Sequence, residues 1–463
     1  MIDWQFFNHE LESLQQKGTI MTHNFLRSFI VILIIYLSPL CYAAPIFEVP
    51  SSFNPVGSGG RALGMAGAYI GSADDGTAAS YNPAGLLRLE DYEFAVVFSH
   101  VNRRENNTFT ISPRSSGGHS ISESDINYLS AALIFECYGL NMAFSMSYQY
   151  LYDLTRDWSF INENYPTSTI YSIDNWIYQQ NGGLSAIGLA YGVQLSKEFS
   201  LGITCNFWDN SLSENKWEQI YHRKGLLVNG TFRLPSEADY TESYTFKGFN
   251  CNIGFMFKLK HNLLIGGVLK TPFSATVDYE RLGRSVKYAY GQTIVDPIHA
   301  KEDLTLDMPM SYGIGLLYTL WDKWSISGDI YCTRWDHFVL RDSEGFEYYP
   351  ITGKRVDESN VDETYQIRLG TEYLFQNQAS IISLRGGLFY DPAPAETHPD
   401  DFWGISLGIG YCTKHRFSFD LAYQFRTGHN VGTGGLAHRG FSQNVYEHTV
   451  YVSFLNYYFP YSR

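Results

Sequence analysis

Two short strings in this chain match the spacing of catalytic motifs. Gly404-Ile-Ser406-Leu-Gly408 has the spacing of a nucleophile elbow, in which the serine stands on a tight turn between a strand and a helix. Gly57-Ser-Gly-Gly-Arg-Ala62 is similar to a dinucleotide-binding loop, which must follow a strand. We expect Ser406 to lie in the middle of a strand and no strand to precede Gly57, so both matches are attributed to chance. The protein is therefore expected not to be an enzyme and to need no cofactor.

Metal and redox chemistry have no better support. The thirteen histidines are scattered, without the H-E-x-x-H spacing of a zinc site. Six cysteines occur singly, without a C-x-x-C pair, so the sequence predicts neither a metal site nor a redox pair. Cys41 lies in a segment that we expect to be removed. The other five fall in alternating apolar stretches, where cysteine serves as a small apolar residue: Cys137, Cys205, Cys251, Cys332 and Cys412.

The N-terminal residues indicate that the chain is exported. The one continuous apolar run, Phe29–Leu37, is too short to span a bilayer, which takes about 20 apolar residues. Arg27 precedes it and Cys41-Tyr-Ala43 follows it, in the order of a secretory signal peptide. We predict cleavage after Ala43. A lipid anchor at Cys41 is the weaker alternative, because the residues before it make a poor lipoprotein box.

The first twenty residues do not look like the start of a signal peptide, since Glu10 and Glu12 are acidic. We predict that translation starts at Met21, with a long and unusual signal peptide as the alternative. Residues 1–43 are thus interpreted as an N-terminal extension and signal peptide.

The composition favours a membrane barrel. Aromatic residues make up 16% of the chain and charged residues only 17%, against about a quarter in ordinary soluble domains. Because only alternate residues of a barrel strand face lipid, the mean hydropathy can stay slightly negative, here −0.19. The net charge of −14 and the lack of a basic stripe in the sequence argue against a nucleic-acid partner.

Apolar and polar residues alternate in fourteen segments. In the clearest, 416–426, Phe417 and Tyr423 fall on one face and Asp420 on the other. A β-sandwich also alternates, but it would not need aromatic side chains so often on its apolar face. With no helix of spanning length after Ala44, such a chain can cross lipid only as a closed barrel. The predicted strands are 91–101, 127–137, 140–152, 183–196, 199–211, 244–258, 262–282, 303–320, 323–338, 361–375, 379–390, 401–414, 416–428 and 444–459.

The connections between these strands alternate between long and short. Outer-membrane barrels have short periplasmic turns and long extracellular loops, so an even strand number places both termini in the periplasm. Pro272 is interpreted as a bulge inside one strand, because splitting that strand would spoil the alternation. The long connections are 102–126, 153–182, 212–243, 283–302, 339–360, 391–400 and 429–443.

Residues 44–90 differ from the rest. They are rich in Gly and Ala, alternate little and precede the first strand. A barrel this wide would leave a pore unless something fills it. We therefore predict an all-β fold, a fourteen-stranded antiparallel transmembrane β-barrel over residues 91–463, with an N-terminal hatch over 44–90 plugging the lumen.

The predicted hatch resembles that of a known family. Its Gly/Ala run, the Ala73-Asp-Asp75 step and Asn82-Pro-Ala84 are similar to the hatch of the FadL/TodX family of outer-membrane transporters for long-chain fatty acids and aromatic hydrocarbons. Order and spacing agree over most of the mature chain. Further similar strings are Met308-Pro-Met-Ser-Tyr-Gly313, Asp322-Lys-Trp-Ser325, Trp335-Asp-His-Phe338, Arg368-Leu-Gly370, Leu384-Arg-Gly-Gly387 and Tyr390-Asp-Pro-Ala-Pro394.

The resemblance implies a fourteen-stranded barrel in the bacterial outer membrane. A hydrophobic ligand would enter a lumenal pocket and leave after hatch movement or sideways through the wall, with the outer-membrane lipid and lipopolysaccharide as surroundings and a monomer as the expected state. The region after Gly57 also resembles secretion-associated barrels of the PorV type, so a structural or secretion-partner barrel is the alternative function. The terminal strand departs from the usual pattern, because Phe459 is followed by four more residues.

Three sets of residues are candidates for the site. In the family, the turn Asn82-Pro83-Ala84 belongs to the hatch near the ligand path; an ordinary turn before the first strand is the alternative. Arg368 and Arg385 fall on polar strand faces and could hold a fatty-acid carboxylate. We favour buried ion pairs with Asp329 or Asp420 for these arginines, because unpaired charge in a narrow barrel is costly. Apolar capture surface in the loop 212–243 is expected from Trp217, Tyr221, Leu226 and Leu227.

Overall fold

The structure is a computed structural model that describes residues 47, 49–55, 57–289, 292–413, 417–433 and 440–458. The predicted start at Met21, the cleavage after Ala43 and Cys41 lie outside these residues. The described chain is mostly antiparallel strand, and its helical turns are short. In this part of the chain no helix combines the length and the apolar character needed to cross a membrane.

Fourteen strands of the described chain form a closed wall. The ring closes where β21 pairs with β1, from Tyr92 opposite Tyr458 to Phe109 opposite Phe441. The predicted fourteen-stranded antiparallel barrel is therefore confirmed. In order round the ring the wall strands are β1 (Tyr92–Phe109), β2 (Gly117–Cys137), β3 (Leu140–Asp153), β5 (Ile170–Gln194), β6 (Phe199–Asp209), β8 (Phe232–Lys260), β9 (Leu263–Lys270), β12 (Ser311–Leu320), β13 (Trp324–Thr333), β17 (Thr364–Gln376), β18 (Ser380–Tyr390), β19 (Phe402–Thr413), β20 (Phe417–Val431) and β21 (Phe441–Tyr458).

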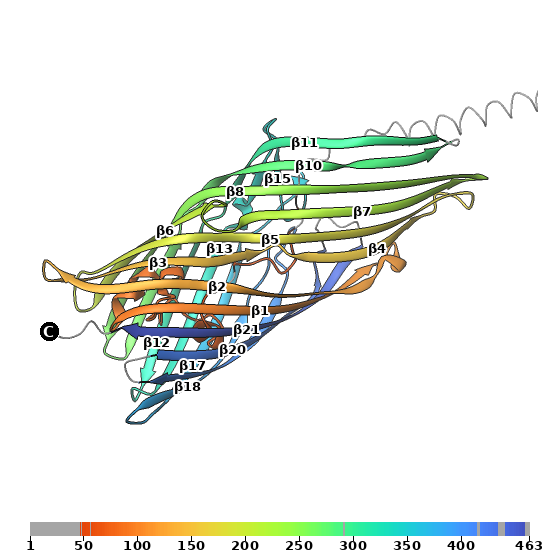
Figure 1. Ribbon diagram of the computed structural model, residues 1–463. Helices are drawn as coiled ribbons and strands as arrows, with labels where there is room; N and C mark the ends of the chain where they lie inside the picture. Colours follow the sequence, from red (N-terminus) through yellow and green to blue (C-terminus); the bar gives the residue numbers. More distant parts are fainter. Residues whose placement is uncertain are drawn as a thin grey trace, which may run out of the picture. The chain divides into compact units, whose positions relative to one another are not determined.

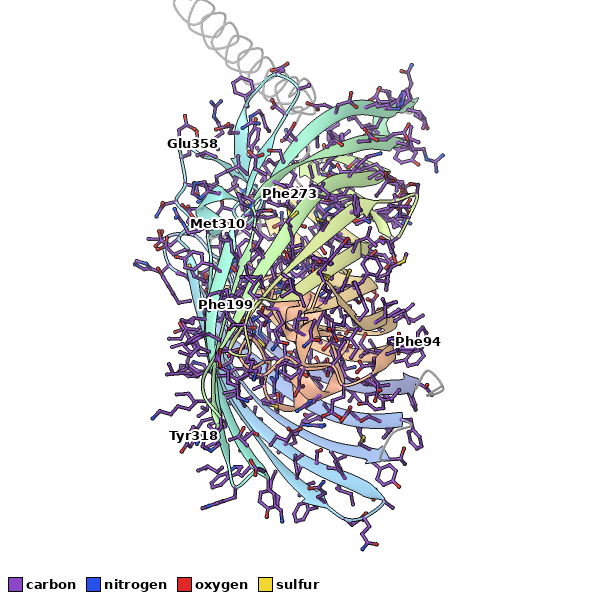
Figure 2. The ribbon with its side chains drawn as sticks, turned by 90° about the vertical axis from the view of Figure 1, so that its left-hand side faces the viewer. Phe94, Phe199, Phe273, Met310, Tyr318 and Glu358 are labelled. Carbon is purple, nitrogen blue, oxygen red and sulfur yellow. The ribbon has the colours of Figure 1, made fainter. Side chains whose placement is uncertain are left out.

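Outward and inward side chains alternate along these strands. On β20, Phe417 and Tyr423 are exposed on the outer face, whereas Asp420 is only 2% exposed and faces the lumen. Figure 2 shows Phe94 and Tyr318, both exposed, on the outer surface of the barrel. An apolar outer face with a polar inner face is what a strand needs when lipid covers one side.

One end of the wall carries short turns, at 138–139, 195–198, 261–262, 321–323 and 377–379. This is the end that we expect to face the periplasm. At the opposite end the strands continue well past the ring, so the connections predicted as loops at 212–243 and 283–302 are largely β-hairpin. Their alternation is weak because neither face there is committed to lipid.

The continuing segments lie side by side as a curved sheet, in which β5, β7, β8, β10 and β11 are the long arrows of Figure 1. The segments are β4 (Arg156–Asn164), β7 (Asn215–Asn229), β10 (Phe273–Ala289), β11 (Gln292–Met308) and β14 (Val339–Arg341). Beyond β14, β15 (Glu347–Tyr349) and β16 (Lys354–Arg355) form a small hairpin.

The strand that contains Pro272 is interrupted there. It ends as β9 at Lys270, between β8 and β12, and resumes as β10 at Phe273, between β8 and β11. Lys270 pairs with residue 252 of β8 and Thr276 with residue 247, so five residues, 271–275, stand opposite four, 248–251. The one-residue excess is a bulge, as predicted. On the other side Pro272 faces Pro309, which separates β11 from β12, and neither proline has an N–H to donate.

Residues 57–89, called the hatch segment below, lie inside the ring. They form α2 (Gly60–Gly64), α3 (Ala78–Tyr81) and the 3₁₀ helix η1 (Pro83–Arg88). α2 contacts β18 to β21, and η1 contacts β2, β3, β5, β6 and β8. The segment therefore touches two different parts of the ring. Most of its residues are buried, because Gly, Ala and Ser side chains are small enough to fit between the strands.

Candidate functional site

The turn at Asn82 ties the hatch segment to the wall. Its side chain is fully buried, and its Oδ1 accepts a hydrogen bond from the Ala84 N–H at 3.2 Å, which caps the helix that Pro83 begins. Its Nδ2 donates to the carbonyl oxygens of Ile70, at 2.9 Å, and of Phe255 on β8, at 3.0 Å. The predicted Asn82-Pro83-Ala84 site is thus a buried connection between the hatch segment and the wall. An ordinary turn would not need the hydrogen bond to Phe255.

Glycines in the wall make room for this turn. A Cβ added to Gly254 would lie 2.1 Å from Asn82 Oδ1, and one added to Gly202 would lie 2.4 Å from the Pro83 carbonyl carbon. At such distances a side chain at either position would force the turn to shift. The wall strands β6 and β8 are therefore shaped to receive the turn.

A chain of five charged side chains links the hatch segment to three wall strands. Arg61 contacts Asp74 at 2.5 Å and makes a two-pronged contact with Glu372, at 3.1 and 2.9 Å. Arg385 donates to Glu372 at 2.7 Å and to Asp420 at 2.5 Å. The side chains of Glu372, Arg385 and Asp420 are at most 4% exposed. Asp420 is one of the two partners predicted from the sequence for the arginines. With Glu372 and Asp420 both in contact, the guanidinium of Arg385 is paired with two carboxylates.

Arg368 has a different partner from those predicted. Its guanidinium contacts Asp391 at 3.0 Å and donates to the Ala66 carbonyl of the hatch segment at 3.0 Å. Asp329 instead accepts hydrogen bonds from the backbone N–H groups of Tyr69, at 2.6 Å, and of the next residue, at 2.8 Å. Asp391 lies in the connection after β18, and no sequence pattern indicated that this connection enters the lumen.

The hatch segment also holds a buried carboxylate of its own. Asp75 is 6% exposed and accepts hydrogen bonds from the Tyr69 hydroxyl at 2.8 Å and from Thr77, whose hydroxyl lies at 2.6 Å and whose N–H lies at 2.9 Å. Burial raises the pKa of Asp75 above its usual range, because the ionised form loses its hydration. These bonds hold the loop between α2 and α3 in one conformation.

On the side of the long hairpins the lumen is filled by apolar side chains. Two of them, Phe47 and Phe53, come from the segment before the hatch and are 2% and 5% exposed. The ring of Phe47 lies 4.9 Å from that of Trp217, and Phe53 stacks on Tyr152 at 5.1 Å and lies 5.5 Å from Trp335. We call this cluster the aromatic chamber. Its other buried members are Leu151, Leu154, Leu184, Ala186, Trp208, Tyr244, Phe246, Ala275, Val277, Tyr279, Leu304, Leu306, Met308, Phe338, Leu340, Tyr349 and Val361.

Sequence reasoning found only part of this chamber. Trp217 was expected in a capture loop, but it lies on β7 with no exposed surface, stacked on Tyr244 at 4.9 Å. Its indole N–H has no hydrogen-bond partner among the described residues. Tyr221, Leu226 and Leu227 lie further along the same strand and are partly buried. Scattered single aromatics carry no spacing signal, so Phe47 and Phe53 could not have been identified.

Two small cavities with mixed polar and apolar lining flank the segment Pro50–Pro55, with volumes of about 110 and 90 Å³. Pro55, Tyr81 and Arg368 line both. Sites for organic ligands usually measure roughly 300–1,000 Å³. A long apolar molecule could therefore pass only if the segment around Phe53 moved.

The two catalytic-looking strings have no supporting geometry. Ser406 is 1% exposed in the middle of β19, and its hydroxyl accepts a hydrogen bond from Gln424 at 3.0 Å. Gly57 follows no strand in the described chain. Nor do the described residues contain a cluster of three or more His, Cys, Asp or Glu suited to a metal ion.

A closed barrel with an apolar outer face and a lumen occupied by its own N-terminal segment defines an outer-membrane barrel with an obstructed path. Residues 52–447 match the profile of the family described as outer membrane protein transport protein (OMPP1/FadL/TodX), and the chain belongs to this family. The resemblance seen in the motifs is thereby confirmed, together with the outer-membrane location. The secretion-partner alternative gains no support.

Solved structures share this fold at low sequence identity. A FadL homologue from Pseudomonas aeruginosa is 13% identical with a TM-score of 0.56, over 89% of this chain and all of that one. The toluene transporter TodX from Pseudomonas putida is 14% identical with a TM-score of 0.52, over 89% and 100%. The toluene transporter TbuX from Ralstonia pickettii is 13% identical with a TM-score of 0.51, over 87% and 99%. Among curated proteins, no sequence matches the chain.

Proposed function

We propose that this protein carries hydrophobic small molecules, such as long-chain fatty acids or aromatic hydrocarbons, across the outer membrane by facilitated diffusion. The observation that supports this is the aromatic chamber, a packed cluster of apolar side chains in the lumen to which Phe47 and Phe53 contribute. These two side chains belong to a segment that precedes the wall strands and is not part of them, so they can leave the chamber without unfolding the barrel. The toluene transporters among the solved structures are consistent with such ligands.

Binding in the chamber would be an exchange of apolar groups. A ligand that takes the place of Phe47 gains about 25 cal/mol for each Å² of apolar surface that it removes from water. The displaced ring loses a similar amount for its own area, so the net affinity depends on how much more surface the ligand buries than the ring did. This mechanism needs no catalysis and no cofactor, and a monomer suffices for it.

The onward path leads past the hatch segment or sideways through the wall. Arg368 lines both of the small cavities, so a ligand carboxylate that enters them could replace Asp391 as its partner. Arg385 already contacts two carboxylates and is 4% exposed, which supports a role in holding the hatch segment. We expect the turn at Asn82 to keep the hatch segment in place until a ligand arrives.

The test uses the full-length protein purified in detergent. It should bind a labelled fatty acid or alkylbenzene, and Trp217→Ala should weaken that binding by about tenfold, since a large ring lining the chamber is lost. Phe94→Ala, on the lipid side, is the matched control and should bind normally. Deletion of the protein should slow uptake of the same ligand by cells. If no ligand binds and uptake is unchanged, the proposal is wrong.

A further inference from the structure

Two cysteines far apart in sequence lie side by side on neighbouring strands of the wall. Cys205 on β6 is the register partner of Cys251 on β8, and their Sγ atoms lie 3.4 Å apart. Their neighbours Phe207 and Phe249 are exposed on the same outer face, with rings 5.2 Å apart. The sequence predicts no redox pair because the two positions are separated by 46 residues.

The backbone around Cys251 shows which kind of cross-strand position this is. Its N–H donates to the Thr271 hydroxyl at 3.0 Å, and its carbonyl accepts from the Thr271 N–H at 2.9 Å. Thr271 follows β9, on the side of β8 away from β6, so the hydrogen-bonding groups of Cys251 point away from Cys205. The two cysteines therefore form a non-hydrogen-bonded pair, in which the Cα atoms of antiparallel strands are about 4.5 Å apart. Disulfides bridge Cα separations of roughly 4.4–6.8 Å.

We propose that Cys205 and Cys251 are joined by a disulfide in the native protein. β6 continues into β7, turns at Gly230 and returns as β8, so the two residues stand at the foot of one long hairpin. The bond would clamp this hairpin where it leaves the wall. It lies next to Thr271, directly before the break at Pro272, and there it keeps β8 attached to β6 on the opposite side of the interruption.

The bond forms by thiol–disulfide exchange with a thiol oxidoreductase of the cell envelope. One cysteine thiolate attacks the disulfide of the oxidoreductase and gives a mixed disulfide and one free oxidoreductase thiol. The second cysteine then attacks the first, which closes the bond and releases the other oxidoreductase thiol. Two protons and two electrons leave the pair, and the oxidoreductase disulfide is reduced to a dithiol. Because ionised thiols are costly in lipid, the exchange takes place before the strands are fully inserted.

The test maps the cysteines in the full-length protein. Cells are treated with a permeant alkylating reagent before lysis, so that no thiol oxidises afterwards, and the protein from the outer membrane is digested without reduction. We expect one linked peptide pair that contains Cys205 and Cys251 and disappears on reduction. The protein is denatured in the same reagent before digestion, so that buried thiols such as Cys332 also react. The other three described cysteines should then be alkylated: Cys137, Cys332 and Cys412. Recovery of Cys205 and Cys251 in separate alkylated peptides would overturn the proposal.

Variants test what the bond does. Cys137→Ser should keep the linked peptide, and Cys205→Ser should lose it and leave Cys251 alkylated. In the double variant Cys205→Ser/Cys251→Ser, limited proteolysis within β7 should be faster by about threefold or more, because the foot of the hairpin opens more often. Cleavage at the wild-type rate would contradict the clamp. The peptide map of the wild-type protein decides the presence of the bond even if a variant fails to assemble.

Discussion

The hatch segment and the aromatic chamber occupy the same lumen but are held in different ways. The hatch segment is attached by directional contacts: the charges from Asp74 through Glu372 to Asp420, and the amide of Asn82. Phe47 and Phe53 are held in the chamber by ring contacts at 4.9 to 5.9 Å. Ring contacts do not require one partner, whereas charge pairs and amide hydrogen bonds do. We therefore expect a foreign apolar molecule to enter at the chamber and not at the hatch interface.

The largest effect should come from breaking the charge chain. Glu372→Gln leaves Arg61 and Arg385 without their shared carboxylate in a buried setting, so we expect a loss of about 3–5 kcal/mol in the free energy of unfolding. Denaturant unfolding in detergent measures it. Glu358→Gln, at an exposed position, is the control and should change little. A loss below about 1 kcal/mol would show that the hatch segment is not held by these charges.

A smaller effect is expected at the turn. Asn82→Ala leaves the carbonyls of Ile70 and Phe255 without their donor, which should cost about 1–3 kcal/mol and speed hydrogen exchange at the Ala84 amide. Asn141→Ala, on the exposed surface, serves as the matched control. Unchanged exchange at Ala84 would mean that the side-chain hydrogen bonds of Asn82 do not hold the turn.

The two substitutions above should lower stability, whereas removal of a side chain from the chamber should strengthen ligand binding. Phe47→Ala removes a competitor from the chamber, so affinity for an apolar ligand should rise by up to about tenfold, equivalent to about 1.4 kcal/mol. Titration with a labelled fatty acid measures this, with Phe94→Ala as the control. Weaker binding in Phe47→Ala would indicate that this ring is part of the ligand site and not a substitute for the ligand.

The smallest effect concerns pH and should be confined to the hatch segment. The pKa of Asp75 is raised in the folded protein, so folding favours its protonated form. Its ionisation therefore costs stability as the pH rises through the folded pKa, and acidification from about pH 7 to about pH 4 should stabilise the wild type relative to Asp75→Asn. Thermal unfolding at several pH values measures the difference. An equal response in both proteins would contradict it.

The sequence was sufficient to predict the wall because apolar and polar residues alternate along its strands. On β20, lipid requires Phe417 and Tyr423 outside and leaves Asp420 inside, and the same alternation holds round the ring. The partner of Arg385 could also be anticipated, since Asp420 lies on a lumenal face nearby. These features follow from period two and from the cost of unpaired charge.

The chamber and the cross-strand contacts were beyond that reasoning. Phe47 meets Trp217 and Phe53 meets Trp335 only because the chain before the hatch segment crosses the lumen, and no local pattern indicates that course. Asp391 reaches Arg368 from a connection whose path depends on tertiary packing. The pairing of Cys205 with Cys251 depends on register between strands that are not adjacent in sequence.

The length of β8 has a consequence for where a ligand first meets the protein. Its 29 residues, at about 3.3 Å each, give a strand of about 95 Å, or about 70 Å of height at a tilt near 40°. The apolar band of an outer membrane takes up about 25 Å of that. The hairpin therefore stands some 45 Å clear of the lipid. An apolar molecule that approaches from the side of the hairpins would therefore meet protein well before it met the membrane.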